Sequence, residues 1–107
     1  MDKIQERFKI GLETYGHGVY VLDDTRQWNT PTNSWINMAE EEILDALIYT
    51  AADILRKKYT LEQNANSKSS NEENDNDAIC IILQTNNVYP IIDKLWDVYF
   101  DMLKLND

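Results

Sequence analysis

The chain has one cysteine among its 107 residues and no long hydrophobic run. A single cysteine excludes an intramolecular disulfide, and the position of Cys80 in the apolar run AICIIL predicts a small buried side chain in a reducing compartment. A membrane-spanning helix needs about 18 or more apolar residues in succession, and none occur, so we expect no membrane contact. The N-terminal segment MDKIQERFKIGLE lacks the apolar stretch of a secretory signal. These absences favour a cytoplasmic protein.

Basic residues are also scarce. The chain has 10 lysines and arginines against 19 aspartates and glutamates, a net charge of -9 and a pI of about 4.4. Binding of duplex nucleic acid through its phosphates needs a basic face, so we expect no duplex partner, and an anionic membrane surface is equally disfavoured. Free nucleotides are not excluded, because a divalent metal ion can supply the missing positive charge.

Several motifs of known chemistry are missing. The sequence contains no glycine-rich phosphate loop, no Cys/His spacing for zinc and no nucleophile elbow. In contrast, 43% of the residues are hydrophobic and 10% aromatic, which is enough for the core of one small domain covering the whole chain.

The first third of the chain predicts one helix and one long connection. Residues 2–15 place Ile4, Phe8 and Leu12 at helical spacing, and the helix should end at the Gly16-His17-Gly18 triplet. Residues 16–33 then form a polar and aromatic loop, with room for a short strand or β-hairpin around Val19–Leu22. A loop this long is uncommon in a small domain unless it has a function.

The rest of the chain predicts three further helices. A central helix should begin after an N-cap at Asn33-Ser34 and run to about Tyr59, while residues 61–77 are low in complexity and predict a flexible polar linker. Residues 78–85 fit a strand or a short helix, and we favour the helix. The last helix, about 90–105, is expected to bury four apolar positions: Ile91, Leu95, Val98 or Tyr99, and Met102. The predicted fold is an all-α bundle of about four helices.

An acidic cluster begins the central helix, in the segment MAEEEILDALIYTAAD. Residues three or four apart share one face of a helix, so Asp45 is a neighbour of both Glu41 and Glu42. Two carboxylates one turn apart can share Mg²⁺, which could orient a phosphate chain and activate a water molecule. The alternative is structural, because acidic side chains in the first turns of a helix favour its dipole.

Residues 42–49, EILDALIY, resemble the ExxD helix of the all-α nucleoside triphosphate pyrophosphohydrolases of the MazG and dimeric dUTPase type. That resemblance implies Mg²⁺-dependent hydrolysis of a nucleoside triphosphate to the monophosphate and pyrophosphate, in a dimer or tetramer. Glu42 and Asp45 would then hold the metal, and Glu41 would be a further catalytic carboxylate. The family's EExxE motif is absent from the preceding helix. Asp93, Asp97 and Asp101, on one stripe of the last helix, could replace it or could form a solvated face.

The wider pattern YGHGV, DDTRQWNT and NSW, followed by MAEEEILDALIY, resembles small uncharacterised proteins of bacteriophage genomes. This second resemblance implies a different function. Phages encode small oligomeric helical proteins that sequester nucleotide messengers of host defence without hydrolysing them, and a helical nucleotide-binding scaffold would suit that role. The location would then be the cytoplasm of the host cell.

Seven residues are candidates for nucleotide contacts. His17 could be a base or a phosphate contact, or could cap a helix end, and Arg26 could clamp phosphate or pair with Asp23 or Asp24. Trp28, Trp35 and Tyr20 could stack on a base or anchor the loop. Tyr49 and Arg56 continue the sector of Asp45 along the helix. We interpret Arg7 and Lys9 as solvent-exposed charges.

The central helix predicts a homo-oligomer. Its apolar positions cover about half of the helix circumference, which is wider than the stripe of an ordinary surface helix. A single chain with so few helices cannot cover both this stripe and its many aromatic residues, so a partner chain would bury the excess.

Overall fold

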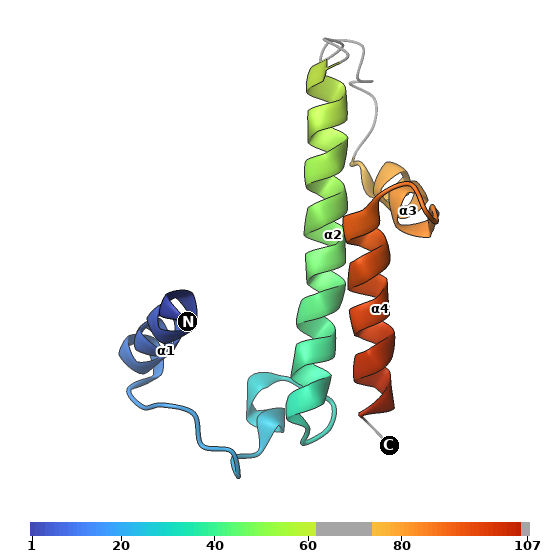
Figure 1. Ribbon diagram of the computed structural model, residues 1–107. Coiled ribbons are helices and arrows are strands. Elements are labelled where there is room, and N and C mark those ends of the chain that lie inside the picture. The colour runs from blue at the N-terminus through green and yellow to red at the C-terminus, as the bar shows by residue number, and fades with distance from the viewer. Residues whose placement is uncertain (62–73, 106–107) are drawn as a thin grey trace.

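The computed structural model describes residues 1–61 and 74–105, and within them the chain forms four α-helices, one short 3₁₀ helix and no strand (Figure 1). The all-α prediction is therefore confirmed. The elements are α1 (Asp2–Tyr15), η1 (Thr25–Trp28), α2 (Trp35–Leu61), α3 (Asn76–Gln84) and α4 (Pro90–Lys104).

Local sequence signals begin and end the helices as predicted. α1 ends at Gly16, which adopts a left-handed conformation with φ of 79° and donates its N–H to the Leu12 carbonyl. α2 begins after Ser34, whose hydroxyl accepts a hydrogen bond from the Asn37 N–H at 3.2 Å. Pro90 is the first residue of α4, where its missing N–H costs no hydrogen bond.

The predicted strand or hairpin in the first loop is absent. Val19 to Leu22 form no regular structure, and η1 follows directly after them. Asp24 explains the difference, because its carboxylate accepts from the Arg26 N–H and so begins a helical turn. No second strand in the described residues is available to pair with this segment.

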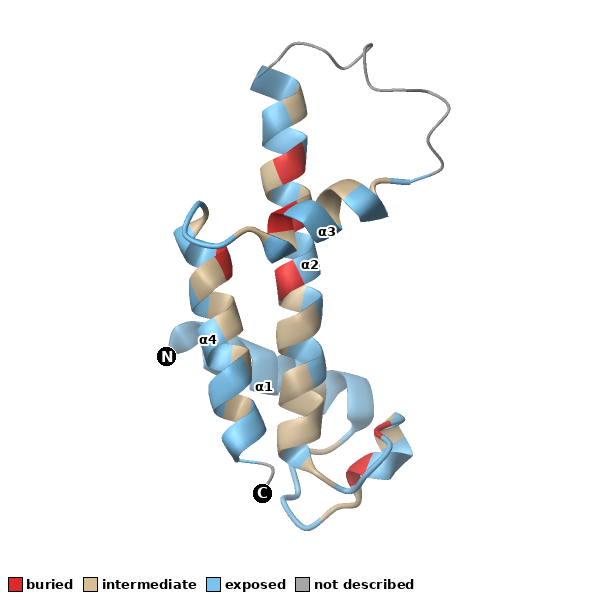
Figure 2. Cartoon of the chain, turned by 90° about the vertical axis from the view of Figure 1, so that its right-hand side faces the viewer, coloured by how far each residue is buried: buried red, intermediate tan, exposed pale blue. Residues whose placement is uncertain are grey.

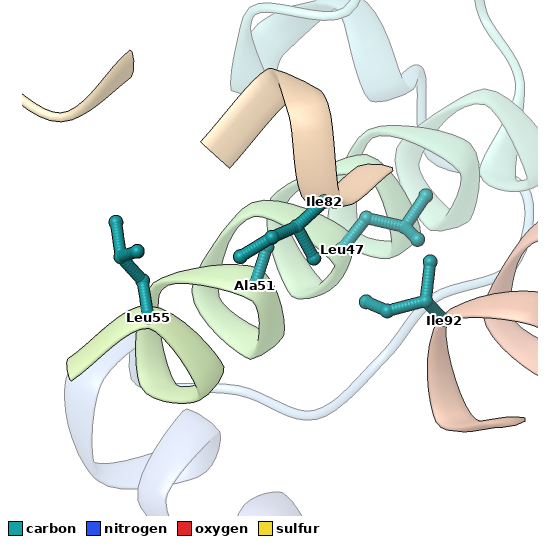
Figure 3. Close-up of a cluster of buried hydrophobic side chains, with 5 residues drawn as sticks. All are labelled: Leu47, Ala51, Leu55, Ile82 and Ile92. Carbon is teal, nitrogen blue, oxygen red and sulfur yellow. The ribbon is translucent and has the colours of Figure 1, made fainter. Parts of the chain in front are cut away.

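The core lies where α2 contacts α3 and α4. α2 runs through the centre, α4 packs antiparallel along its first half, and α3 crosses it higher up (Figure 1). The buried hydrophobic residues are Leu47, Ala51, Leu55, Ile82 and Ile92 (Figure 3). The three from α2 are spaced by four residues and form one stripe. Complete burial of each leucine or isoleucine contributes about 1.5–3 kcal/mol, so this small cluster supplies much of the stability.

The predicted buried face of α4 is correct at Leu95, which packs against the core, while Tyr99 and Met102 are half-buried. It is wrong at Ile91, which is exposed, because Ile92 is the completely buried residue. Trp96 provides the physical reason, because its indole packs against the core and its Nε1 donates to the Leu83 carbonyl at 3.0 Å. This contact with α3 turns Ile92 toward α2 and leaves Ile91 outside.

Two other predictions need correction around α3. Cys80 is exposed and not buried, because the nine-residue helix packs through one side only, with Ile82 directed into the core. The predicted linker, 61–77, is shorter than expected, since Leu61 belongs to α2 and α3 begins at Asn76. Its residues 62–73 lie outside the described part of the chain.

α1 stands apart from the other helices. It has no buried residue, and its apolar stripe of Ile4, Phe8, Leu12 and Tyr15 is between 50% and 65% exposed. Figures 1 and 2 show α1 on the side of α2 opposite α4. Among the helices that the structure describes, none has both the length and the apolar character needed to cross a membrane.

Candidate functional site

A pocket of about 690 Å³ lies between α1 and the start of α2, and we call it the α1–α2 pocket. Its walls come from one face of α1, from residues 17–19, from η1 and from the first turn of α2. Aromatic side chains dominate the lining, while three basic residues also contribute to it. The aromatic lining residues are Phe8, Tyr15, Trp28 and Trp35, and the basic ones are Arg7, Lys9 and His17.

The two tryptophans form one wall of the α1–α2 pocket. The ring centroids of Trp28 and Trp35 lie 5.5 Å apart, with an angle of 42° between the ring planes. Trp35 also donates its Nε1–H to the Val21 carbonyl at 2.9 Å, which ties the first loop to α2. These contacts give the pocket a fixed aromatic surface, of the kind on which a planar ring can stack.

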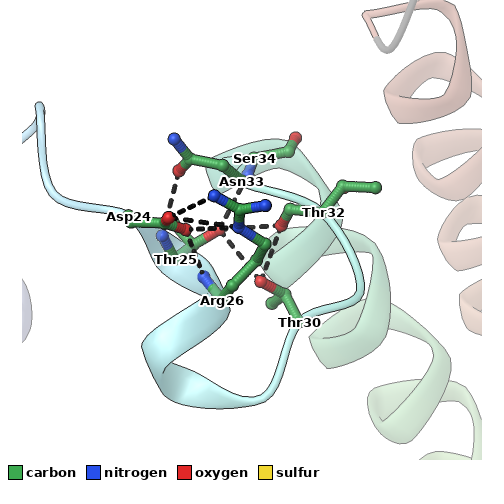
Figure 4. Close-up of polar contacts among 7 residues, drawn as sticks. All are labelled: Asp24, Thr25, Arg26, Thr30, Thr32, Asn33 and Ser34. Atoms are coloured by element: carbon green, nitrogen blue, oxygen red, sulfur yellow. Dashed lines mark hydrogen bonds and ion pairs between the residues drawn. The ribbon is translucent and has the colours of Figure 1, made fainter.

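A hydrogen-bonded knot holds η1, and therefore Trp28, against α2 (Figure 4). Thr25 is fully buried at its centre. Its Oγ1 accepts the Ser34 N–H at 2.7 Å and lies 2.9 Å from the Thr30 hydroxyl, while its N–H donates to the Asn33 side chain at 3.0 Å. Because buried polar groups are costly when unsatisfied, this network fixes the loop conformation.

Arg26 is paired with Asp24 and does not line the pocket. Its Nη2 lies 2.6 Å from Asp24 Oδ2, and its Nε lies 2.9 Å from Oδ1, so the guanidinium contacts both carboxylate oxygens. The side-chain hydrogen bonds from Arg26, followed by its backbone N–H, lower the pKa of Asp24 to about 2. Of the alternatives that the sequence left open for Arg26, the structure contains the salt bridge with Asp24.

His17 lies in the pocket wall, and its neighbour Tyr20 lies outside the lining. The two rings stack with centroids 5.0 Å apart and planes 26° apart. His17 Nδ1 lies 2.6 Å from the Gly18 carbonyl, so this nitrogen acts as the donor and leaves Nε2 available to a ligand. Tyr20 thus supports the imidazole from behind.

The acidic cluster lies on the exposed surface of α2. Glu41, Glu42 and Asp45 are all exposed, and none of them lines the α1–α2 pocket. Within the described residues, no three His, Cys, Asp or Glu side chains are grouped so that they could hold one metal ion. Glu42 and Asp45 do continue the α2 face that begins with Trp35 and Met38, given the three- and four-residue spacing between them.

The other predicted polar residues lie away from the pocket lining. Tyr49 and Arg56 are exposed further along α2. On α4, Asp93 accepts a hydrogen bond from the Asn87 N–H at 3.2 Å, while Asp101 pairs with Lys104 at 3.5 Å. The structure therefore brings together His17, Trp28 and Trp35, and separates them from the remaining candidates.

Sequence reasoning missed the contribution of α1 to the site. Arg7 and Lys9, interpreted as solvent charges, line the pocket together with Phe8 and Tyr15. A signal was present, because the apolar stripe of α1 directly precedes the glycine-flanked His17. Helical periodicity identifies that stripe but not the surface it faces.

No protein-family model matches the chain, and no curated protein or solved structure matches it. The two resemblances drawn from the sequence therefore stay predictions.

Proposed function

We propose that the chain binds a nucleotide in the α1–α2 pocket and holds it without hydrolysis. The observation that carries this proposal is the joint placement of an aromatic wall and basic groups around one pocket of about 690 Å³. Pockets for small molecules typically measure about 300–1,000 Å³ and combine apolar walls with a few polar groups. A base would stack on Trp28 and Trp35, and phosphate would contact Arg7, Lys9 and His17.

The charge distribution supports this ligand class. The chain carries a net charge of -9, yet no aspartate or glutamate lines the pocket. Two permanent cations, Arg7 and Lys9, do line it. An anionic ligand is thus attracted to this pocket, where basic groups and aromatic walls occur together. A lining without carboxylates also favours binding over metal-assisted hydrolysis, which fits a protein that sequesters signalling nucleotides of host defence.

A filtration experiment tests the proposal. The protein is mixed with linear and cyclic nucleotides, with and without Mg²⁺, and the retained and free pools are quantified by ion-exchange chromatography. We expect one nucleotide to be retained and then recovered intact after denaturation. Failure of the protein to retain any nucleotide at a concentration of 100 μM would contradict the proposal.

Matched variants locate the binding site. Trp28→Ala should weaken binding about 10- to 100-fold, because stacking contributes about 1–3 kcal/mol per base. Lys9→Ala should weaken nucleotide binding less than Trp28→Ala does. Its effect should be larger at low salt than at high salt. Phe100→Ala and Lys104→Ala are the controls, since both residues are exposed on α4 and lie outside the lining. Equal effects of Lys9→Ala and Lys104→Ala would place the ligand elsewhere.

A second candidate is the Mg²⁺-dependent nucleotide pyrophosphohydrolase. The specific observation in its favour is that Glu42 and Asp45 continue the α2 face of the pocket residues Trp35 and Met38. This carboxylate pair fits two ligands of an ion that retains several waters. In the filtration experiment the enzyme would convert a triphosphate to the monophosphate and pyrophosphate only with Mg²⁺. Asp45→Asn should abolish that conversion.

A further inference from the structure

One side of α4 carries a regular apolar stripe that the rest of the described chain covers only in part. We call it the outer seam of α4, and it consists of Ile91, Leu95, Val98, Met102 and Leu105. Its spacing alternates between four and three residues, which is the pattern of a helix that packs lengthwise against another helix. Ile91, Val98 and Leu105 are 49%, 40% and 70% exposed. Leu95 and Met102 are half-buried, and Leu95 also packs against the core.

The outer seam borders the face that holds α4 in the fold and shares Leu95 with it. Ile92 is completely buried on that face, and Trp96 donates to α3 from it. The outer residues of the seam, Ile91, Val98 and Leu105, are the ones that the described chain leaves exposed.

We propose that the outer seam of α4 packs antiparallel against the same seam of a second copy of this chain. Val98 is the midpoint of the seam, so a twofold axis beside it places Ile91 opposite the partner's Leu105, and Leu105 opposite the partner's Ile91. Such an isologous contact is the commonest type in soluble homodimers. This interface is independent of the proposed nucleotide site, because α1 lies across α2 from α4 (Figure 1) and no residue of α4 lines the α1–α2 pocket.

Charge complementarity selects both the occupant and its direction. Lys94 and Asp101 flank the seam on the same side, seven residues apart. In an antiparallel pair, the flank of one helix that carries Lys94 and Asp101 meets the same flank of the other helix. Lys94 then lies opposite the partner's Asp101, and Asp101 lies opposite the partner's Lys94. Within the described residues Lys94 forms no ion pair, and the Asp101–Lys104 pair is weak because both side chains are more than 75% exposed. Two reciprocal ion pairs thus form only across the dimer.

The size of the interface sets its strength. α4 has 15 residues and a length of about 22 Å, so one helix pair buries less than the standard interface of about 1,600 Å². The resulting dimer should dissociate in the micromolar range. Sedimentation velocity of the full chain at concentrations from 5 to 500 μM tests this expectation. The dimer should predominate at the higher concentrations.

Charge reversal is the decisive test. Lys94→Asp and Asp101→Lys should each weaken dimerisation about tenfold, because each places like charges opposite one another. The double variant restores opposite charges across the axis and should return the dissociation constant to within about threefold of the wild type. A double variant no tighter than the singles, or a wild-type chain that is monomeric at 500 μM, would overturn the proposal.

Two further sets of variants separate interface effects from folding effects. Val98→Glu should abolish the dimer, whereas Ile81→Glu, at an apolar position on α3 that is 66% exposed against 40% for Val98, should leave it intact. Far-UV circular dichroism verifies that both variants remain helical. If Ile81→Glu abolishes the dimer and Val98→Glu does not, the seam is not the interface.

Disulfide trapping determines the direction of the helices. In a Cys80→Ser background, Val98→Cys should form a crosslinked dimer on mild oxidation, because position 98 meets itself at the axis. Ile91→Cys should crosslink poorly, since it faces the partner's position 105. Efficient crosslinking through position 91 would show a parallel pair and overturn the antiparallel arrangement.

Discussion

α1 and α2 differ sharply in packing. Both carry an apolar stripe, which is wider in α2, yet α2 buries Leu47, Ala51 and Leu55 while α1 buries no residue at all. The α1–α2 pocket lies between them and borrows one wall from each. The comparison teaches that the stability of the chain and the shape of its candidate site rest on different elements. Mutations can therefore separate the two properties.

The largest effect is expected in the core. Leu47→Ala and Ile92→Ala should each lower the free energy of unfolding by about 2–5 kcal/mol, because each leaves a cavity that the neighbouring helices fill only in part. Leu12→Ala in α1 removes the same number of atoms as Leu47→Ala but should cost less than about 1 kcal/mol. Urea titration followed by circular dichroism measures both. Equal losses at Leu12 and Leu47 would show that α1 packs as tightly as α2.

The second effect concerns the knot that holds η1. Thr25→Val removes the hydroxyl that accepts the Ser34 N–H and should cost about 1–3 kcal/mol, since that buried donor loses its partner. Thr25→Ser retains the hydroxyl and should cost clearly less. The free energy of unfolding comes from denaturant titration, and tryptophan fluorescence reports the surroundings of Trp28 and Trp35. A Val variant as stable as the Ser variant would exclude this role for the hydroxyl.

A smaller effect is expected at the start of α2. Ser34→Ala removes the cap on the Asn37 N–H and should lower stability by about 1 kcal/mol. Ser34→Asp provides the control, because aspartate caps helices equally well and adds a favourable charge at the positive end of the dipole. Thermal unfolding followed at 222 nm compares the two. If the alanine variant unfolds at the same temperature as the aspartate variant, the capping role of Ser34 is contradicted.

The smallest effect is the pH dependence of the Asp24–Arg26 pair. Arg26 lowers the folded-state pKa of Asp24 from 3.8 to about 2, so the stabilisation is complete above the unfolded pKa and is lost as the pH falls through about 2. Both side chains are well exposed, and the contribution to stability is therefore small. NMR titration of the Asp24 carboxyl carbon should give a midpoint near 2. Arg26→Gln should raise this midpoint toward the ordinary value without reaching it, because the backbone N–H of residue 26 still donates to Asp24. An unchanged midpoint would disprove the role of the guanidinium.

The helices and their ends could be predicted from sequence because their signals are local. Gly16 ends α1, Ser34 caps α2 and Pro90 begins α4, each through contacts within a few residues. The burial of Leu95 was predictable from helical spacing, but the choice between Ile91 and Ile92 was not, since both lie on apolar stripes. The contact between Trp96 and Leu83, two residues of different helices, decides between them.

The candidate site was only partly predictable for the same reason. His17 and Trp28 stood out because a long loop of mixed aromatic and charged residues is unusual. Arg7 and Lys9 did not, because charges beside an apolar stripe normally face water, and only the fold places them at a pocket. The acidic residues Glu41 and Glu42 illustrate the reverse case, because a sequence motif directed attention to side chains that are not part of the pocket lining.

The isolation of α1 has a consequence for hydrogen exchange. An unsupported helix of 14 residues is marginal in water, so the amide protons of α1 should exchange through local fraying, while those around Leu47 exchange only when the whole chain unfolds. One wall of the pocket is thus as stable as the protein, and the other opens and closes many times between global unfolding events. A ligand that needs both walls would slow exchange in α1 far more than in α2, and its measured affinity would include the free energy of holding α1 in place.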